Sequence, residues 1–144
     1  MQNFKRMKKE DLKEVAEKMK KIDFCLMTTA GEKGKFNSRP MSNNGEVEFD
    51  GDSWFFTYQD TDKIREIKKN PAVSLNFSGD GMIFIHVAGH ARIITDKNLM
   101  KKYWLPSLEM WFPEGVDTEG IAMIEVKAET IKYWNKEKEA TINL

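Results

Sequence analysis

Residues 54–77 read WFFTYQDTDKIREIKKNPAVSLNF and hold a strand, a short helix and a second strand in succession. The aromatic run Trp54–Thr57 predicts the first strand. Lys63–Lys69 is a predicted helix that ends at Asn70-Pro71, because a proline drives the residue before it out of the helical region. Ala72–Ser78 then predicts the second strand.

The rest of the chain adds mostly short strands. Further strands are predicted at Phe24–Thr29, Phe36–Met41, Val47–Phe49, Met82–His86, Ala88–Thr95, Ile121–Val126 and Ile131–Trp134. Helices are predicted at Lys8–Lys21, Asp96–Trp104 and Ser107–Phe112. Asp50-Gly51 suits a tight turn and predicts a hairpin between Val47–Phe49 and Trp54–Thr57. Because βαβ units do not recur along the chain, a barrel or sandwich is favoured over a parallel sheet.

Composition limits the class of protein. We interpret residues 1–144 as one domain, with a helix at about 8–21 and a barrel at about 24–135. The 23 basic and 23 acidic residues balance, which argues against a nucleic-acid or membrane-surface partner. Cys25 stands alone in an apolar run and fits a reducing compartment. Since no segment has the length and apolarity of a membrane span, we expect a soluble, cytoplasmic protein.

Two cations lie beside predicted strand and helix ends. Arg39 is near the end of one strand, and Lys63 opens the helix that follows Thr57. A guanidinium binds two phosphate oxygens in a fork, an ammonium adds a point charge, and the amides of a helix start attract anions. The pair predicts a phosphate site, with Asp60 or Thr61 as the helix cap. The alternative is that both are ordinary solvated surface cations.

The order of motifs resembles the flavin-binding split barrel of the pyridoxamine 5'-phosphate oxidase-like superfamily, in particular its general stress protein 26 type. The shared motifs, in chain order, are Arg39, Phe55-Phe56-Thr57, Lys63, Asn70-Pro71 and Val87-Ala88-Gly89-His90-Ala91. The likeness extends over about residues 8–134. It implies a mainly β fold with peripheral helices, arranged as a split β-barrel of the FMN-binding type.

The resemblance also implies flavin mononucleotide (FMN) as cofactor. The positions that match its binding residues are Arg39, Pro40, Met41, Ser42, Phe56, Thr57, Lys63 and Trp111. By this likeness Arg39 and Lys63 hold the phosphate, and residues 40–42 contact the polar edge of the isoalloxazine ring mainly through their backbone. Phe56 and Thr57 then line the ring from the neighbouring strand.

Two positions need separate comment. Asp62 stands where the oxidases proper carry a second basic residue, and a carboxylate beside a phosphate is repulsive unless it caps the helix or points outward. Trp111 belongs to a Trp-Phe-Pro motif that resembles one in the stress-protein branch, where the tryptophan approaches the flavin across a dimer interface. The alternative for Trp111 is that it packs its loop onto the barrel.

The sequence predicts neither a metal site nor a catalytic residue. His86 and His90 are four residues apart on a predicted strand, about 13 Å, which is too far to share one ion. Cys25 has no evident base partner and is expected in the core.

The function that the resemblance implies is a flavin-dependent oxidoreductase acting on an unknown small substrate, in a homodimer with the cofactor at its interface. The oxidases proper continue into an arginine- and histidine-bearing segment that binds their substrate. This sequence ends ten residues after Trp134 without one, so we expect a relative of the oxidase and not the oxidase itself. Two alternatives stay open: a non-catalytic flavin-binding or stress-related module, and the same fold binding haem or a deazaflavin.

Overall fold

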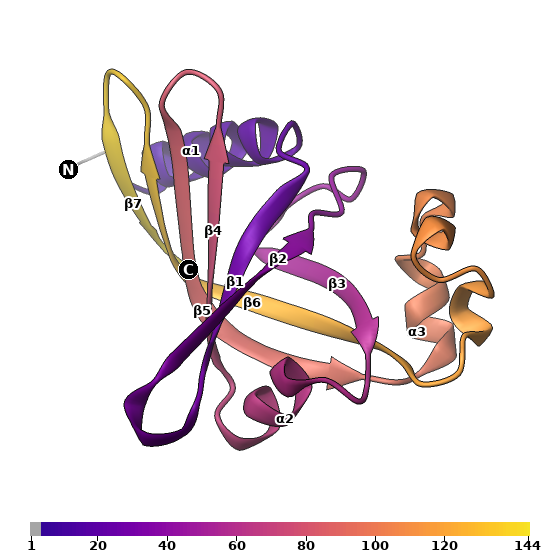
Figure 1. The fold of residues 1–144 in the computed structure, drawn as a ribbon. Coiled ribbons are helices and arrows are strands. Elements are labelled where there is room, and N and C mark those ends of the chain that lie inside the picture. Colours follow the sequence, from indigo (N-terminus) through magenta and orange to yellow (C-terminus); the bar gives the residue numbers. More distant parts are fainter. Residues whose placement is uncertain (1–3) are drawn as a thin grey trace.

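Two long strands, β5 (Ile83–Ile94) and β6 (Ile121–Trp134), lie at the centre of a strongly curled antiparallel sheet in the computed structural model (Figure 1). The structure describes residues 4–144, with side chains from residue 10 onward. The other strands are β1 (Phe24–Ala30), β2 (Phe36–Ser42), β3 (Asp52–Tyr58), β4 (Ala72–Gly79) and β7 (Glu139–Asn143). The strand order is β2-β1-β4-β5-β6-β3, and β7 pairs with β6 beside this path.

Three helices lie around the sheet. They are α1 (Phe4–Met19), α2 (Asp62–Lys69) and α3 (Lys97–Lys102). In Figure 1, α1 crosses the upper end of the sheet, α2 lies at its lower end, and α3 stands beside β3. Short 3-10 turns at Glu32–Gly34, Pro106–Met110 and Gly115–Asp117 complete the connections. Among the described residues, no helix has the length and apolarity needed to cross a membrane.

The backbones of the two long strands lie close together at Gly89. Ala88 pairs with Thr130 but Gly89 pairs with Ala128, so Glu129 is an extra residue on β6, and this is a β-bulge. A Cβ on Gly89 would lie 2.0 Å from the backbone oxygen of Lys127, so only glycine fits there. On one side of the bulge β6 pairs with β7 over residues 130–134, and on the other it pairs with β3 over residues 121–127.

The curled sheet does not close into a full barrel. β2 and β3 are the two ends of the strand order, and neither has a second strand partner. Their free edges define the split of the barrel. The predicted fold class, a mainly β split barrel with peripheral helices, is therefore confirmed.

The core divides into two apolar clusters. The larger fills the concave side of the sheet, and its fully buried side chains include Met27, Phe55 and Tyr133. The smaller joins the outside of β3 to α3 and the turns after it, where Trp54 stacks on Tyr103 at a ring distance of 3.8 Å. Alternation along β3 sends Phe55 to the first cluster and Trp54 to the second.

The structure differs from the predicted elements at several places. Val47–Phe49 is a loop and not a strand, because Phe49 anchors in the larger cluster while Val47 packs against the smaller one. β5 and β6 are each one continuous strand where the sequence predicted two, since the bulge bends the ladder without ending it. The polar segment after Asn135 forms β7, which the sequence did not predict.

We expect Gly89→Ala to lower the free energy of unfolding by about 2–3 kcal/mol, because the added methyl group meets backbone that has no room to move. Urea unfolding measures this. Gly79→Ala is the control, since its new methyl would meet side-chain atoms of Ile22 and Ile83 at 3.2 Å or more and should cost much less. Equal losses for the two variants would contradict the role given to the bulge.

Candidate functional site

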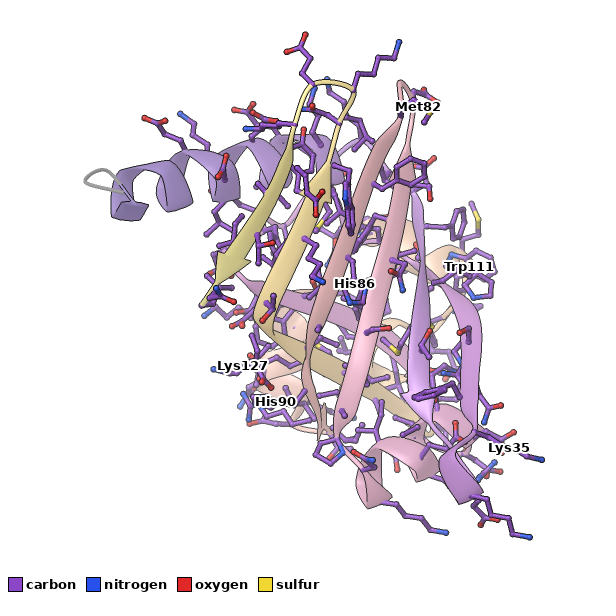
Figure 2. The ribbon with its side chains drawn as sticks, turned by 90° about the vertical axis from the view of Figure 1, so that its left-hand side faces the viewer. Lys35, Met82, His86, His90, Trp111 and Lys127 are labelled. Atoms are coloured by element: carbon purple, nitrogen blue, oxygen red, sulfur yellow. The ribbon has the colours of Figure 1, made fainter. Side chains whose placement is uncertain are left out.

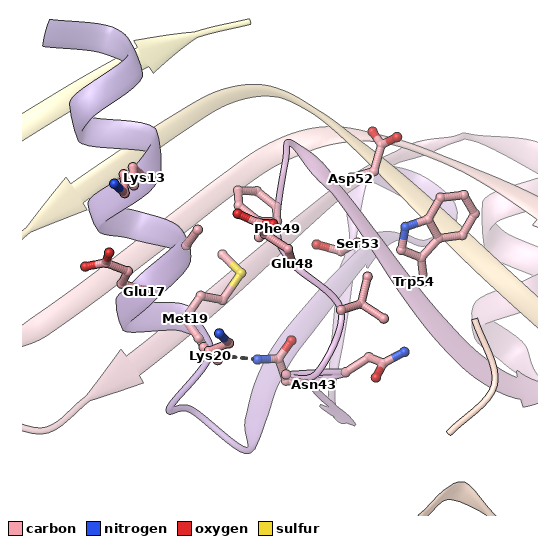
Figure 3. Close-up of a pocket in the computed structure, with 14 residues that line it drawn as sticks. Lys13, Glu17, Met19, Lys20, Asn43, Glu48, Phe49, Asp52, Ser53 and Trp54 are labelled. Atoms are coloured by element: carbon pink, nitrogen blue, oxygen red, sulfur yellow. Dashed lines mark hydrogen bonds between the residues drawn. The ribbon is translucent and has the colours of Figure 1, made fainter. Parts of the chain in front are cut away.

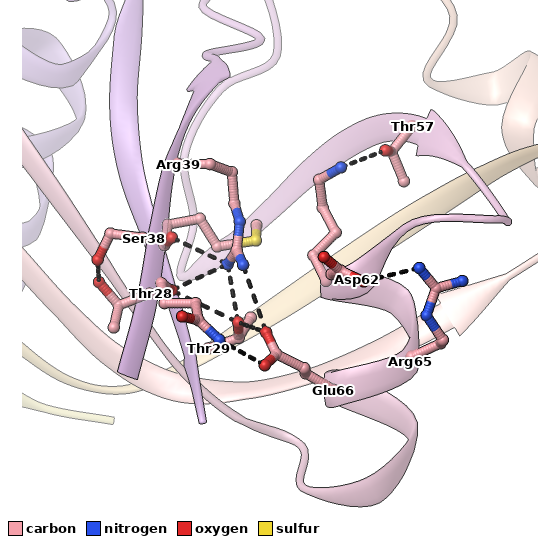
Figure 4. Close-up of polar contacts among 11 residues, drawn as sticks. Thr28, Thr29, Ser38, Arg39, Thr57, Asp62, Arg65 and Glu66 are labelled. Carbon is pink, nitrogen blue, oxygen red and sulfur yellow. Dashed lines mark hydrogen bonds and ion pairs between the residues drawn. The ribbon is translucent and has the colours of Figure 1, made fainter. Parts of the chain in front are cut away.

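Arg39 lies on β2, at one edge of the split, and its guanidinium is held by the chain itself (Figure 4). Nη1 donates to the Thr29 hydroxyl at 2.8 Å and to the backbone oxygens of Asn37 at 3.1 Å and Met27 at 3.3 Å. Nη2 donates to Oε1 of Glu66 at 3.3 Å. Within the described residues, these contacts all use the Nη atoms, and none uses the Nε–H group.

Glu66, on α2, connects three elements. Its Oε1 accepts from the Thr29 hydroxyl of β1 at 2.7 Å, and its Oε2 accepts from the Asn37 amide of β2 at 2.6 Å. Gly31 allows this approach, because a Cβ there would lie 2.9 Å from both the Asn37 amide nitrogen and Oε2 of Glu66. The Thr29 hydrogen bond, helped by Asn37 and Arg39, lowers the pKa of Glu66, so the carboxylate is charged at neutral pH.

Lys63 approaches from the other edge of the split. It lies one turn before Glu66 on α2, and its ammonium donates to the Thr57 hydroxyl of β3 at 2.9 Å. Burial lowers the pKa of Lys63, and the positive charge of Arg39 lowers it further, while Asp62 acts in the opposite direction. Arg39 pairs with Glu66, one turn further along α2 than Lys63, so both cations lie beside this helix, and the Lys63 contact on β3 is the buried Thr57.

The Asp62 side chain points outward, which is one of the two orientations that would keep its carboxylate from repelling a phosphate. Its carboxylate accepts from Nη2 of Arg65 at 2.7 Å and is 85% exposed. Asp60 accepts from Nη1 of the same guanidinium, also at 2.7 Å. Thr61 is the residue before α2, but its hydroxyl donates back to the Tyr58 backbone oxygen, so the predicted side-chain cap does not form.

The arrangement suits an anionic group. Two cations from opposite edges of the split outweigh the single carboxylate of Glu66, and the amides that open α2 add partial positive charge. A phosphate between Arg39 and Lys63 would receive charge-assisted hydrogen bonds from both. The residues of the site come from α2 and from the strands β2 and β3, which are far apart in the strand order of the sheet. The curl of the sheet is what brings them near one another.

The segment 40–42 runs along the free edge of β2. Pro40 and Ser42 are exposed on the outer face of the sheet, while Met41 is buried in the larger cluster. Their side chains therefore point away from the edge, in opposite directions. Backbone groups are what this segment offers to a ligand in the split.

Phe56 and Trp111 lie on the α3 side of β3. Phe56 packs edge-to-face on Trp104 at a ring distance of 5.0 Å, so at this position too the backbone faces the split edge. Trp111 is 56% exposed, and its backbone oxygen accepts from the Tyr58 hydroxyl at 3.4 Å. The structure thus joins the side chains of Lys63 and Thr57, and it places Arg39 next to α2 through Glu66. Trp111 contacts Tyr58, the residue after Thr57.

A separate hollow of about 180 Å³ lies between α1 and residues 43–54 (Figure 3). Met19, Phe49 and Trp54 supply apolar wall, and Lys20 and Glu17 stand among the charged residues that line it. Lysines and carboxylates are mixed along this lining, so the hollow lacks the one-sided charge of the Arg39–Lys63 space.

The remaining chemically versatile side chains have structural partners. His86 contacts the Asn76 side chain at 2.8 Å, and His90 contacts Glu129 at 2.8 Å. Within the described part of the chain, no group of three or more histidine, cysteine or acidic residues could hold a metal ion. Burial raises the pKa of Cys25 to about 12, so its thiol is unreactive at neutral pH.

Comparison with known proteins identifies the family. The family described as "Pyridoxamine 5'-phosphate oxidase like" matches residues 10–144. The chain belongs to the pyridoxamine 5'-phosphate oxidase-like family. The superfamily resemblance in the motif order is thereby confirmed.

The individual relatives have low sequence identity to this chain. Protein bli-3 of Neurospora crassa is 28% identical over 123 residues, and the chain spans 57% of that relative's length. A Clostridium acetobutylicum protein related to general stress protein 26 of Bacillus subtilis has a TM-score of 0.81, with 24% identity over 94% of this chain and 95% of its own. The general stress FMN/FAD binding protein of Xanthomonas citri has a TM-score of 0.70, with 24% identity over 97% and 96%. At these identities the structures show a shared fold.

The sequence analysis missed Glu66 and its partners Thr29 and Asn37. One signal was available, because Lys63 and Glu66 are three residues apart on a predicted helix and so lie on one face. The contacts with Thr29 and Asn37 depend on the β1–β2 register, in which Thr29 stands opposite Asn37. That register was not predicted.

Glu66 should make stability depend on acid pH. Since its folded-state pKa lies below the unfolded value of 4.5, its bonds stabilise the fold above that value and are lost as the pH falls through the folded pKa. We expect the stability difference between wild type and Glu66→Gln to shrink between about pH 6 and about pH 3 in urea unfolding. Glu32→Gln, which removes an exposed carboxylate, should track wild type throughout. A difference that stays constant with pH would contradict the assignment.

Proposed function

We propose that this chain binds FMN in the split of the barrel, with the phosphate between Arg39 and Lys63. The observation that carries the proposal is the placement of these two cations beside α2, where Lys63 donates to Thr57 of β3 and Arg39 of β2 pairs with Glu66 one turn further along the helix. Family membership and the FMN/FAD-binding Xanthomonas citri protein of the same fold support a flavin as the ligand.

The flat ring would lie along the free edge of β2. Residues 40–42 and Thr57 would contact its polar edge, the former through backbone groups that no second strand occupies. Phe56 would contribute backbone, since its ring packs on Trp104. A bound flavin supplies electron and hydride transfer by its own chemistry. The protein residues would orient the ring and exclude water from its buried face.

The proposed activity is that of a flavin-dependent oxidoreductase acting on a small substrate. The substrate would approach the ring face that the barrel leaves open, because β2 and β3 border the split without covering it. Trp111, exposed and joined to β3 through Tyr58, is proposed to pack against the flavin.

We further propose a homodimer with the cofactor at its interface, in which the contact between subunits extends over the outer face of the sheet. This face carries Phe24 and Leu26 of β1, which are 55% and 50% exposed, and Phe84 of β5. The register puts Leu26 opposite Asn76, and Asn76 opposite His86, so these residues share the face shown in Figure 2, where His86 lies near its centre. Exposed apolar side chains grouped in this way favour a protein interface.

Arg39→Ala should weaken FMN binding about ten- to a hundredfold, because it removes a charge-assisted contact of about 1.5–3 kcal/mol. Quenching of FMN fluorescence on titration measures the dissociation constant, and an absorption spectrum of the desalted protein shows whether flavin is retained. Lys97→Ala is the charge-matched control, since Lys97 pairs with Asp117 beside α3 and outside the split. Equal affinities of the Arg39 variant and wild type would refute the phosphate assignment.

Leu26→Glu should dissociate the dimer, since it places a charge in the middle of the proposed interface. Light scattering after size exclusion should then give 16.8 kDa in place of twice that mass. Leu144→Glu is the control, because Leu144 is equally exposed and lies near Gly51. Wild type that is monomeric at micromolar concentration would refute the dimer.

A further inference from the structure

Glu66 is a carboxylate in direct contact with one of the two cations of the site. Its carboxylate lies 3.3 Å from Arg39, the residue proposed to bind the phosphate. Its helix neighbours Asp60 and Asp62 also carry charge, but they are exposed and paired with Arg65 on the outside of α2. Glu66 is the carboxylate that a ligand phosphate on Arg39 would meet.

The position of this charge is fixed by the surrounding structure. The Glu66 side chain is only 17% exposed, and its two oxygens are held at 2.7 Å and 2.6 Å by Thr29 and Asn37. The absence of a side chain at Gly31 gives it room. A surface carboxylate that met Arg39 by chance would have neither of these fixed partners.

The contacts give Glu66 two opposing effects on an anion. Directly and through the Thr29 hydroxyl, it fixes the position of the guanidinium. Its charge, however, reduces the net charge of Arg39, Lys63 and Glu66 together from two to one. A phosphomonoester carries nearly two negative charges near neutral pH, so it is repelled by Glu66 while it is attracted by both cations.

We infer that Glu66 is a specificity-determining residue, which sets how strongly the site prefers a phosphate-bearing flavin over the same flavin without phosphate. The inference rests on the proposed function, because it takes FMN as the ligand. Glu66 fixes the orientation of the Arg39 side chain and at the same time weakens the attraction between Arg39 and the phosphate. FMN is therefore bound in a defined orientation but with less than maximal affinity.

The test compares FMN with riboflavin, which has the same ring and ribityl chain and lacks the phosphate. Glu66→Gln keeps an oxygen that accepts from Thr29 and Arg39, and Asn37 can turn its amide over to accept from the new NH₂ group. The variant therefore removes the charge and keeps the geometry. We expect the ratio of the riboflavin to the FMN dissociation constant to rise roughly five- to twentyfold, with riboflavin affinity unchanged.

Glu32→Gln is the matched control, because it removes one carboxylate from the exposed β1–β2 turn and should leave the ratio at its wild-type value. An unchanged ratio in Glu66→Gln would overturn the inference while leaving FMN binding in place. Equal weakening of both flavins would also overturn it, since that is the result of a purely structural role. Wild type that binds neither flavin would overturn the proposed function and this inference with it.

Discussion

The close crossing of β5 and β6 at Gly89 is the constraint on which the shape of this protein depends. The extra residue Glu129 shifts the ladder there, and the lack of a side chain on Gly89 lets the two backbones approach. Beyond the bulge β6 leaves β7 and pairs with β3. The sheet therefore curls far enough to bring β3 round toward β2, and stops short of closing the barrel.

The open split gives the site its chemistry. Unpaired strand edges are normally a liability, because their backbone groups invite other chains. Here the edges border a space lined by Arg39 from one side and by Lys63 and Thr57 from the other. In a closed barrel, the backbone N–H and C=O groups of these two edges would pair with each other. In the split barrel, they can hydrogen-bond to a flat ligand that has polar atoms along its rim. In the proposed site, the phosphate end and the ring edge of the flavin would lie in one opening.

The sequence predicted the fold class correctly and singled out Arg39 and Lys63 as candidates for a phosphate site, and it failed where long-range pairing decides the structure. Local propensity identified the residues of β3, α2 and β4, since each begins or ends at a strong signal such as Asn70-Pro71. Apolar Val47 and Phe49 alternate with a polar residue as in a strand, but each anchors the loop to a different cluster. β7 was missed because its register against β6, and not its composition, makes it a strand. Glu66 was missed for the same reason, as its partners come from the β1–β2 pairing.

A cation that binds an anionic ligand must have a fixed position and must also keep its positive charge uncompensated. These two requirements conflict when a carboxylate fixes the position. Arg39 held only by neutral oxygens would keep its full charge but would lose the strong contact that Glu66 provides. Glu66 in turn would be costly near the split if Thr29 and Asn37 did not satisfy its oxygens. The pair therefore stays charged within the site, and Lys63, whose ammonium contacts a neutral hydroxyl, remains the less compensated cation. In the proposed site, Arg39 would therefore contribute chiefly direction to anion binding, and Lys63 would contribute chiefly charge.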